Sequence, residues 1–168
     1  MQDLNFPIFE YKKGQSLKAS GHQHGEEFRE SIHELAKIRL LNTSDTIKTL
    51  RENLVFIGGR VPLVIEVKSV LEPDSEAFVQ SIADVLLQYD GKFAVMSFQH
   101  HICVHFSKMM PDIPRGLTAE GGEDKTEIHL KAMYDYDLQF VSYGVDELPH
   151  PFVDQMRMEG LPVITWTV

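Results

Sequence analysis

The sequence predicts an α/β protein built on a parallel β-sheet, and three observations support this fold class. Short, β-prone apolar segments alternate with amphipathic helical segments. Segment 61–68 is apolar on both faces, as expected for a parallel strand that is covered on both sides. Five such strands recur at intervals of roughly 20 to 30 residues, which is typical of repeated βα units in an open sheet or a barrel. Five strands are too few to close an eight-stranded barrel.

Composition and charge exclude several classes of protein. The chain has 168 residues, of which 43% are hydrophobic, and this predicts one globular domain over residues 1–168. The net charge of −9 and the lack of a basic run argue against nucleic-acid binding. The single cysteine, Cys103, excludes an internal disulfide and a cysteine-based zinc cluster. With no apolar run of membrane-spanning length and no secretory signal, the expected location is the cytoplasm.

The first part of the chain carries the weakest patterns. Residues 1–25 form a poorly defined N-terminal segment, in which residues 6–9 are predicted as a short strand and the glycine-rich remainder as a loop. Apolar residues at helical spacing predict one helix over 26–41 and another over 47–57, which Gly58 and Gly59 end. The strand over 61–68 follows.

The remainder of the chain alternates regularly between helices and strands. Capping residues before the helices, and glycine or proline after them, set the predicted limits. Four further strands are predicted over 93–97, 113–117, 138–142 and 161–168. Four helices are predicted over 75–89, 99–110, 125–134 and 148–159. No glycine-rich dinucleotide-binding motif follows the first strand, so a dinucleotide-binding sheet is not supported.

Glu66 and Lys68 are the leading candidates for a site, because parallel α/β folds bind ligands at the carboxyl ends of their strands. The two residues are two positions apart near the end of a buried strand, so both side chains leave the same face. Burying such a pair is costly, and use by a metal ion or an anionic substrate would explain it. A solvent-exposed ion pair of little energetic value is the alternative.

Other predicted strand ends add further polar and aromatic groups. These residues are Ser97, Arg115, Ser142, Tyr143 and Trp166. A carboxylate, a lysine and an aromatic ring at one mouth suit a divalent cation, a phosphate and an apolar sugar or glycerol face. For Trp166 and Arg115 a place in the core or a surface ion pair remains an open alternative.

Histidines support a competing prediction. His22 and His24 lie in a glycine-flanked segment, and His101 and His105 are four positions apart in a predicted helix. The second pair shares one helix face and is suited to chelate a transition metal ion. No glutamate follows to complete a metalloprotease-type motif. Solvated histidines on the helix and in the loop are the alternative explanation.

The order of these segments resembles the glycerophosphodiester phosphodiesterase family from about residue 35 to residue 168. Thr46-Ile-Lys-Thr-Leu50 resembles the family's helical approach to its Ile-Glu-x-Lys strand, which Val61-Pro-Leu-Val-Ile-Glu-Val-Lys68 resembles in turn. Later strands of the family match in the same order at Phe93-Ala-Val-Met-Ser-Phe98, Pro111-Asp-Ile-Pro-Arg-Gly-Leu117 and Pro162-Val-Ile-Thr-Trp-Thr-Val168.

The resemblance implies a (β/α)8 TIM barrel, of which this chain would form a part. It implies metal-dependent hydrolysis of glycerophosphodiesters to glycerol 3-phosphate and an alcohol, in lipid metabolism and phospholipid degradation. By the same resemblance, Glu66 matches a metal-ligand glutamate for calcium or magnesium. Lys68 matches a lysine beside the phosphate, and Trp166 matches a tryptophan that lines the substrate pocket.

The sequence also departs from the family pattern. No His-Arg-Gly, Glu-x-Asp or His-Asp motif precedes the Ile-Glu-Val-Lys segment, and Val168 comes before the family's last strand with Thr-Asp. We therefore expect a truncated barrel with little or no hydrolytic activity. A non-catalytic remnant, or a protein that self-associates through open sheet edges, is the alternative. A histidine-based metal-binding module is a third and weaker possibility.

Overall fold

A computed structural model describes residue 37, residue 39, residues 44–68 and residues 75–166. The chain divides into two compact units, Met1–Phe56 and Ile57–Val168. The N-terminal segment 1–25, with its predicted strand over 6–9 and with His22 and His24, lies outside the described residues. The prediction of one domain over residues 1–168 stays a prediction.

Helix α2 (Leu50–Ile57) begins with a reciprocal pair of capping hydrogen bonds. The Glu52 amide donates to Thr49 Oγ1 at 3.2 Å, and the Thr49 amide donates to Glu52 Oε2 at 2.7 Å. These bonds start the helix at Leu50, three residues later than predicted. Gly58 and Gly59, with φ of 57° and 73°, end it as predicted, because glycine adopts the left-handed conformation at low cost.

The helix predicted over 26–41 does not extend to its predicted end. Lys37 lies in a turn, and Arg39 forms an isolated antiparallel bridge with Thr46. A bridge residue has extended backbone and cannot belong to an α-helix, so the prediction is wrong at Arg39, and Lys37 is assigned to a turn and not to a helix. The other residues of this range lie outside the part of the chain that the structure describes.

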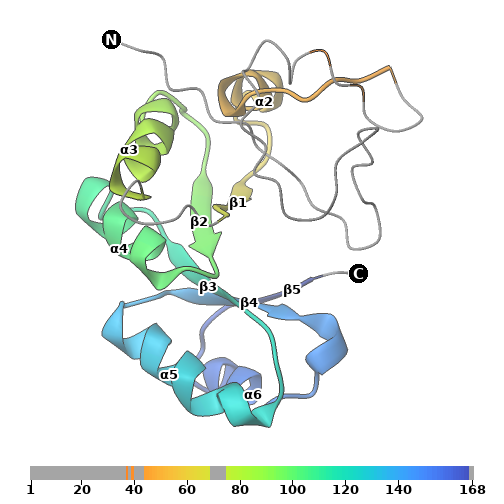
Figure 1. Cartoon of the computed structure of the whole chain (residues 1–168), viewed down its shortest axis with the longest axis vertical. Coiled ribbons are helices and arrows are strands. Elements are labelled where there is room, and N and C mark those ends of the chain that lie inside the picture. Colours follow the sequence, from red (N-terminus) through yellow and green to blue (C-terminus); the bar gives the residue numbers. More distant parts are fainter. Residues whose placement is uncertain (1–36, 38, 40–43, 69–74, 167–168) are drawn as a thin grey trace, which may run out of the picture. The chain divides into compact units, whose positions relative to one another are not determined.

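The second unit is built on a five-stranded parallel sheet in the order β1-β2-β3-β4-β5 (Figure 1). The strands are β1 (Leu63–Glu66), β2 (Phe93–Ser97), β3 (Arg115–Ala119), β4 (Phe140–Gly144) and β5 (Val163–Trp166). The α-helices that connect them are α3 (Ser75–Leu86), α4 (His100–Met109), α5 (Thr126–Asp135) and α6 (Pro151–Met158). Short 3-10 helices, Glu123–Lys125 and Val145–Glu147, precede α5 and α6. The predicted α/β class with a parallel sheet is therefore confirmed.

Strand β4 begins later in the sequence than predicted, because the residues before it end helix α5. Asp137 has a φ of 48°, and the Leu138 amide donates to the Met133 carbonyl at 3.0 Å. This combination of a left-handed residue and a bond back into the last turn is a common way to end a helix. The strand predicted over 138–142 is consequently found at Phe140–Gly144.

Strand β3 also begins two residues later than predicted, which moves Arg115 from the end of the strand to its start. Arg115 is only 6% exposed, and its Nη1 donates to the carbonyls of Pro111 at 3.1 Å and Ile113 at 2.9 Å. The guanidinium therefore holds the turn between α4 and β3. The prediction that Arg115 lies at the carboxyl ends of the strands is wrong.

The helices pack on one face of the sheet, where the main core lies (Figure 1). The buried cluster there contains Cys103, Leu117, Ala119, Ala132, Met133, Leu138, Val141, Tyr143, Phe152, Val153 and Met156. Residues that alternate with the core positions point to the opposite side, because successive side chains of a strand leave opposite faces. We call this side the inner face: Val64, Glu66, Ala94, Met96, Gly116, Thr118, Phe140, Ser142, Gly144, Ile164 and Trp166.

The sheet curls so that its inner face is concave. Phe98 directly follows β2 and Trp166 ends β5, yet their ring centroids are only 5.6 Å apart. Strands β3 and β4 lie between them, so side chains standing upright on a flat sheet would be about 14 Å apart at the usual strand spacing. This curvature and the uniform parallel order are those of a partial (β/α)8 barrel. Among the described residues, no helix has the length and apolar character needed to cross a membrane.

Candidate functional site

Glu66 and Lys68 meet at the carboxyl end of β1, as their spacing predicts. The Lys68 Nζ donates to Glu66 Oε1 and Oε2, both at 2.8 Å. The Glu66 side chain is 24% exposed and that of Lys68 is 51% exposed, so the pair is partly open to solvent. An ion pair at this exposure contributes little stability. Its two charged groups therefore remain accessible to a ligand at the concave side of the sheet.

The described residues do not by themselves form a calcium or magnesium site. These ions require several oxygen ligands, roughly six to eight for calcium. The one carboxylate of Glu66 already accepts hydrogen bonds from Lys68 on both oxygens. In the stretches that the structure describes, no group of three or more histidine, cysteine, aspartate or glutamate side chains is arranged to hold a metal ion. Calcium or magnesium binding through Glu66 stays a prediction.

Trp166 forms an aromatic wall with Phe98 at the same end of the sheet. The two rings meet edge to face, with an angle of 81° between their planes. The Trp166 indole donates to the Ser142 carbonyl at 3.2 Å, which fixes the ring over the inner face. Trp166 is half-buried and Phe98 is 39% exposed. An exposed aromatic edge beside a charged pair suits a ligand that has both an apolar and an anionic part.

Gly144 ends β4 at the place where three side chains converge. A Cβ built on Gly144 would lie 3.6 Å from Glu120 Cβ, 3.8 Å from Trp166 Cζ2 and 3.9 Å from Glu147 Cγ. Glu120 follows β3 directly and is exposed, so a second acidic residue lies at the carboxyl ends of the strands, which we call the mouth of the sheet. Sequence reasoning missed Phe98, Glu120 and Gly144. Their positions one residue after a strand, or at its last residue, are the signal that would have found them.

Ser97 has a structural role at the mouth. Its side chain is 1% exposed, and its Oγ donates to the Val67 carbonyl at 2.7 Å. The Gln99 amide donates to the same Oγ at 3.0 Å. The hydroxyl therefore ties the residue after β1 to the turn that leads into α4. These two hydrogen bonds hold Val67, the residue between Glu66 and Lys68, in place.

Ser142 and Tyr143 were predicted together but leave opposite faces of β4. Ser142 points to the inner face, where its hydroxyl is buried and has no hydrogen-bond partner among the described residues. Tyr143 packs in the helix-facing core and donates to the Gly121 carbonyl at 2.7 Å. Burial, assisted by the nearby Glu147 carboxylate, raises the pKa of Tyr143 to about 12. Tyr143 therefore supports the loop after β3 and does not line the mouth.

Two half-buried histidines have lowered pKa values. His129 lies 5.2 Å from the Phe152 ring and 5.8 Å from the Tyr143 ring, measured between ring centroids. Its burial lowers its pKa, although the Glu120 carbonyl at 3.1 Å from Nε2 acts in the opposite direction. Burial also lowers the pKa of His100, and the neighbouring His101 adds to the effect.

We expect the protein to lose stability as the pH falls below about 6.5, the ordinary histidine pKa. A lowered pKa in the folded state means that the unfolded chain binds more protons between the two pKa values. The stabilisation is therefore complete above about 6.5 and is lost as the pH falls through the lowered values. Urea unfolding at pH 7.5, 6.5 and 5.5 measures this slope, and His129→Gln should reduce it. An identical slope in wild type and variant would contradict the prediction.

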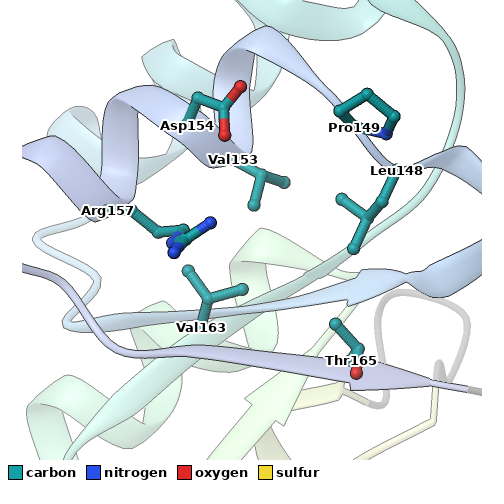
Figure 2. Close-up of a pocket in the computed structure, with 7 residues that line it drawn as sticks. All are labelled: Leu148, Pro149, Val153, Asp154, Arg157, Val163 and Thr165. Atoms are coloured by element: carbon teal, nitrogen blue, oxygen red, sulfur yellow. The ribbon is translucent and has the colours of Figure 1, made fainter.

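A cavity of about 420 Å³ lies away from this mouth, between α6 and β5 (Figure 2). Its lining residues are Leu148, Pro149, Val153, Asp154, Arg157, Val163 and Thr165. Val163 and Thr165 alternate along β5 with Ile164 and Trp166, so they face the helices. The cavity and the mouth therefore lie on opposite sides of β5, and the cavity does not extend the candidate site.

The curled parallel sheet, with polar groups at its strand ends, places this chain in the class of partial (β/α)8 barrels. Solved structures with a similar fold exist. A phosphodiesterase from Oleispira antarctica, solved with the product sn-glycerol-3-phosphate, matches at a TM-score of 0.64 and 20% identity. A glycerophosphodiester phosphodiesterase from Parabacteroides distasonis matches at a TM-score of 0.61 and 19% identity. The matches cover 73% and 82% of this chain but only 50% and 58% of those chains. No family model and no curated protein matches the sequence. The predicted resemblance to glycerophosphodiester phosphodiesterases is confirmed at the level of the fold.

Proposed function

We propose that the mouth of this curled sheet is part of the substrate site of a glycerophosphodiester phosphodiesterase. In this proposal Lys68 binds the phosphate, and Trp166 with Phe98 contacts the apolar face of the glycerol. The observation that carries the proposal is the meeting of a charged pair and an aromatic wall on one concave face, within a fold shared with such enzymes. An ammonium group and an aromatic surface are suited to these two parts of the ligand.

The proposed activity of this chain on its own is binding with little or no hydrolysis. Attack on a phosphodiester needs a positioned base, an acid for the leaving alcohol and a cation on the phosphoryl oxygens. The family motifs that resemblance would assign to these tasks do not precede the Ile-Glu-Val-Lys segment. At the mouth, Glu66 and Lys68 neutralise each other. We expect no hydrolysis of glycerophosphocholine above a blank, with or without added calcium or magnesium.

Binding of sn-glycerol 3-phosphate in metal-free buffer tests the role of Lys68. A hydrogen bond to a charged group contributes roughly 1.5–3 kcal/mol, so Lys68→Ala should weaken binding by about tenfold or more, measured by calorimetry. Lys92→Ala is the matched control, because Lys92 is an exposed lysine that precedes β2 at the other end of the strand. Equal affinity in wild type and Lys68→Ala would refute the assignment.

The Glu66→Gln variant separates two roles for this carboxylate. Without metal, the variant should bind sn-glycerol 3-phosphate more tightly, since Lys68 is released from its ion pair. If Glu66 is a calcium ligand, the same variant should bind less tightly when calcium is present. Clear turnover of glycerophosphocholine that disappears in Glu66→Ala would overturn the proposal of a chain with little activity.

The alternative, a non-catalytic protein that self-associates, depends on the two outer strands of the sheet. Strands β1 and β5 are the first and last in its order. On the inner face, Val64 of β1 is 48% exposed and Ile164 of β5 is 36% exposed. Self-association through such strands stays a prediction, and a monodisperse monomer in light scattering would count against it.

A further inference from the structure

His101 and His105 occupy adjacent turns of α4 on one side of the helix. Their ring centroids are 6.3 Å apart, and the ring planes make an angle of 77°. Helix α4 packs against α3, whose first residue, Ser75, contacts His105. The pair therefore lies at the junction of two helices, on the helix side of the sheet and outside the proposed substrate site.

One nitrogen of each ring is buried without a hydrogen-bond partner. These atoms are His101 Nε2 and His105 Nδ1. The explanation that these histidines are simply solvated is therefore wrong for these two nitrogens. A buried polar atom without a partner destabilises the fold, so two of them on adjacent helix turns require an explanation. A shared ligand that accepts both lone pairs would provide it.

Ser75 fixes the orientation of the second ring. Its hydroxyl lies 3.4 Å from His105 Nε2, and the serine itself is 2% exposed. When the hydroxyl accepts the Nε2 proton, the lone pair of His105 is on Nδ1, which is the nitrogen without a partner. Metal-binding histidines are usually held in this way, with the other ring nitrogen donating to a neighbouring oxygen.

We propose that His101 Nε2 and His105 Nδ1 bind a divalent zinc ion, or a transition metal ion of similar chemistry, and that Ser75 acts as a positioning residue. Two neutral imidazoles favour zinc, copper or nickel, whereas calcium and magnesium prefer oxygen ligands. The described residues contain no group of three metal-binding side chains, so this pair supplies two of the ion's ligands. This site is independent of the cation predicted at Glu66.

Calorimetric titration of the full chain with zinc tests the proposal. We expect binding that His101→Gln and His105→Gln each weaken by about tenfold or more, because each variant removes one of the two ligands that the described residues supply. Ser75→Ala should weaken zinc binding by a smaller factor while both ligands remain. Calcium should not compete with zinc. Circular dichroism of each variant establishes that it is folded.

Two control variants separate this site from His100 and from the pair His22 and His24. His100→Gln changes the neighbouring residue on the same helix and should leave zinc affinity unchanged. His22→Gln combined with His24→Gln should do the same. Unchanged zinc affinity in the His101→Gln and His105→Gln double variant, or loss of binding in the His22 and His24 variant, would overturn the proposal.

A measurement on the wild-type chain avoids dependence on variants that fail to fold. Proton–nitrogen NMR spectra report whether an imidazole nitrogen carries a proton, a lone pair or a metal ion. Zinc should shift the signals of His101 Nε2 and His105 Nδ1 but leave those of His129 unchanged. Unchanged signals of His101 and His105 in excess zinc would also overturn the proposal.

Discussion

Replacement of Phe152 by alanine is expected to lower the free energy of unfolding by about 3–5 kcal/mol, the usual cost of removing a buried phenylalanine side chain. Phe152 is 0% exposed in the helix-facing core. Its ring centroid lies 5.2 Å from that of His129 and 5.8 Å from that of Tyr143. Alanine would leave a cavity among these rings, and its high helix propensity would not compensate for the lost contacts.

Chemical denaturation of Phe152→Ala measures this loss. Met158→Ala is the matched control, because Met158 is on the same helix and is 81% exposed. Its substitution should change the free energy of unfolding by no more than about 0.5 kcal/mol. Phe152→Leu should lose less than Phe152→Ala, since it fills more of the cavity. Equal stability of Phe152→Ala and Met158→Ala would show that the core does not lie where the structure has it.

Gly116→Ala is expected to destabilise the protein by about 1–3 kcal/mol, the typical cost of inserting atoms into a packed interior. Gly116 lies on the inner face of β3, beneath the ring of Phe140 from the neighbouring strand. A Cβ at Gly116 would be 2.3 Å from Phe140 Cε2 and 2.4 Å from Cζ. Because Phe140 is only 5% exposed, the ring has little space into which it can move.

A double variant tests this cause directly. Phe140→Leu shortens the side chain over Gly116, so Gly116→Ala should cost less in that background than in the wild type. Gly122→Ala is the control glycine, because its nearest neighbour to a new Cβ is Asp124 Oδ1 at 3.4 Å. Purely additive effects of Gly116→Ala and Phe140→Leu would exclude steric conflict between the two positions as the cause.

The part of the site that depends on one strand was predictable from the sequence. Glu66 and Lys68 are two positions apart, so strand alternation alone places their side chains on one face, and they contact each other there. Arg115 was misplaced because the extent of β3 depends on the turn after α4, which Arg115 itself holds by hydrogen bonds. Phe98 was missed because its partner Trp166 is reached only across two intervening strands.

The alternation of helices and strands, and therefore the parallel α/β class, was determined by the sequence itself. Local periodicity records which side of each element is buried, and the burial of apolar side chains is the main force that selects its conformation. Only the tertiary structure decided how strongly the sheet curls and which strand ends form one mouth. Those features depend on contacts such as Phe98 with Trp166 and Gly116 with Phe140, between residues distant in the sequence, and local patterns do not encode them.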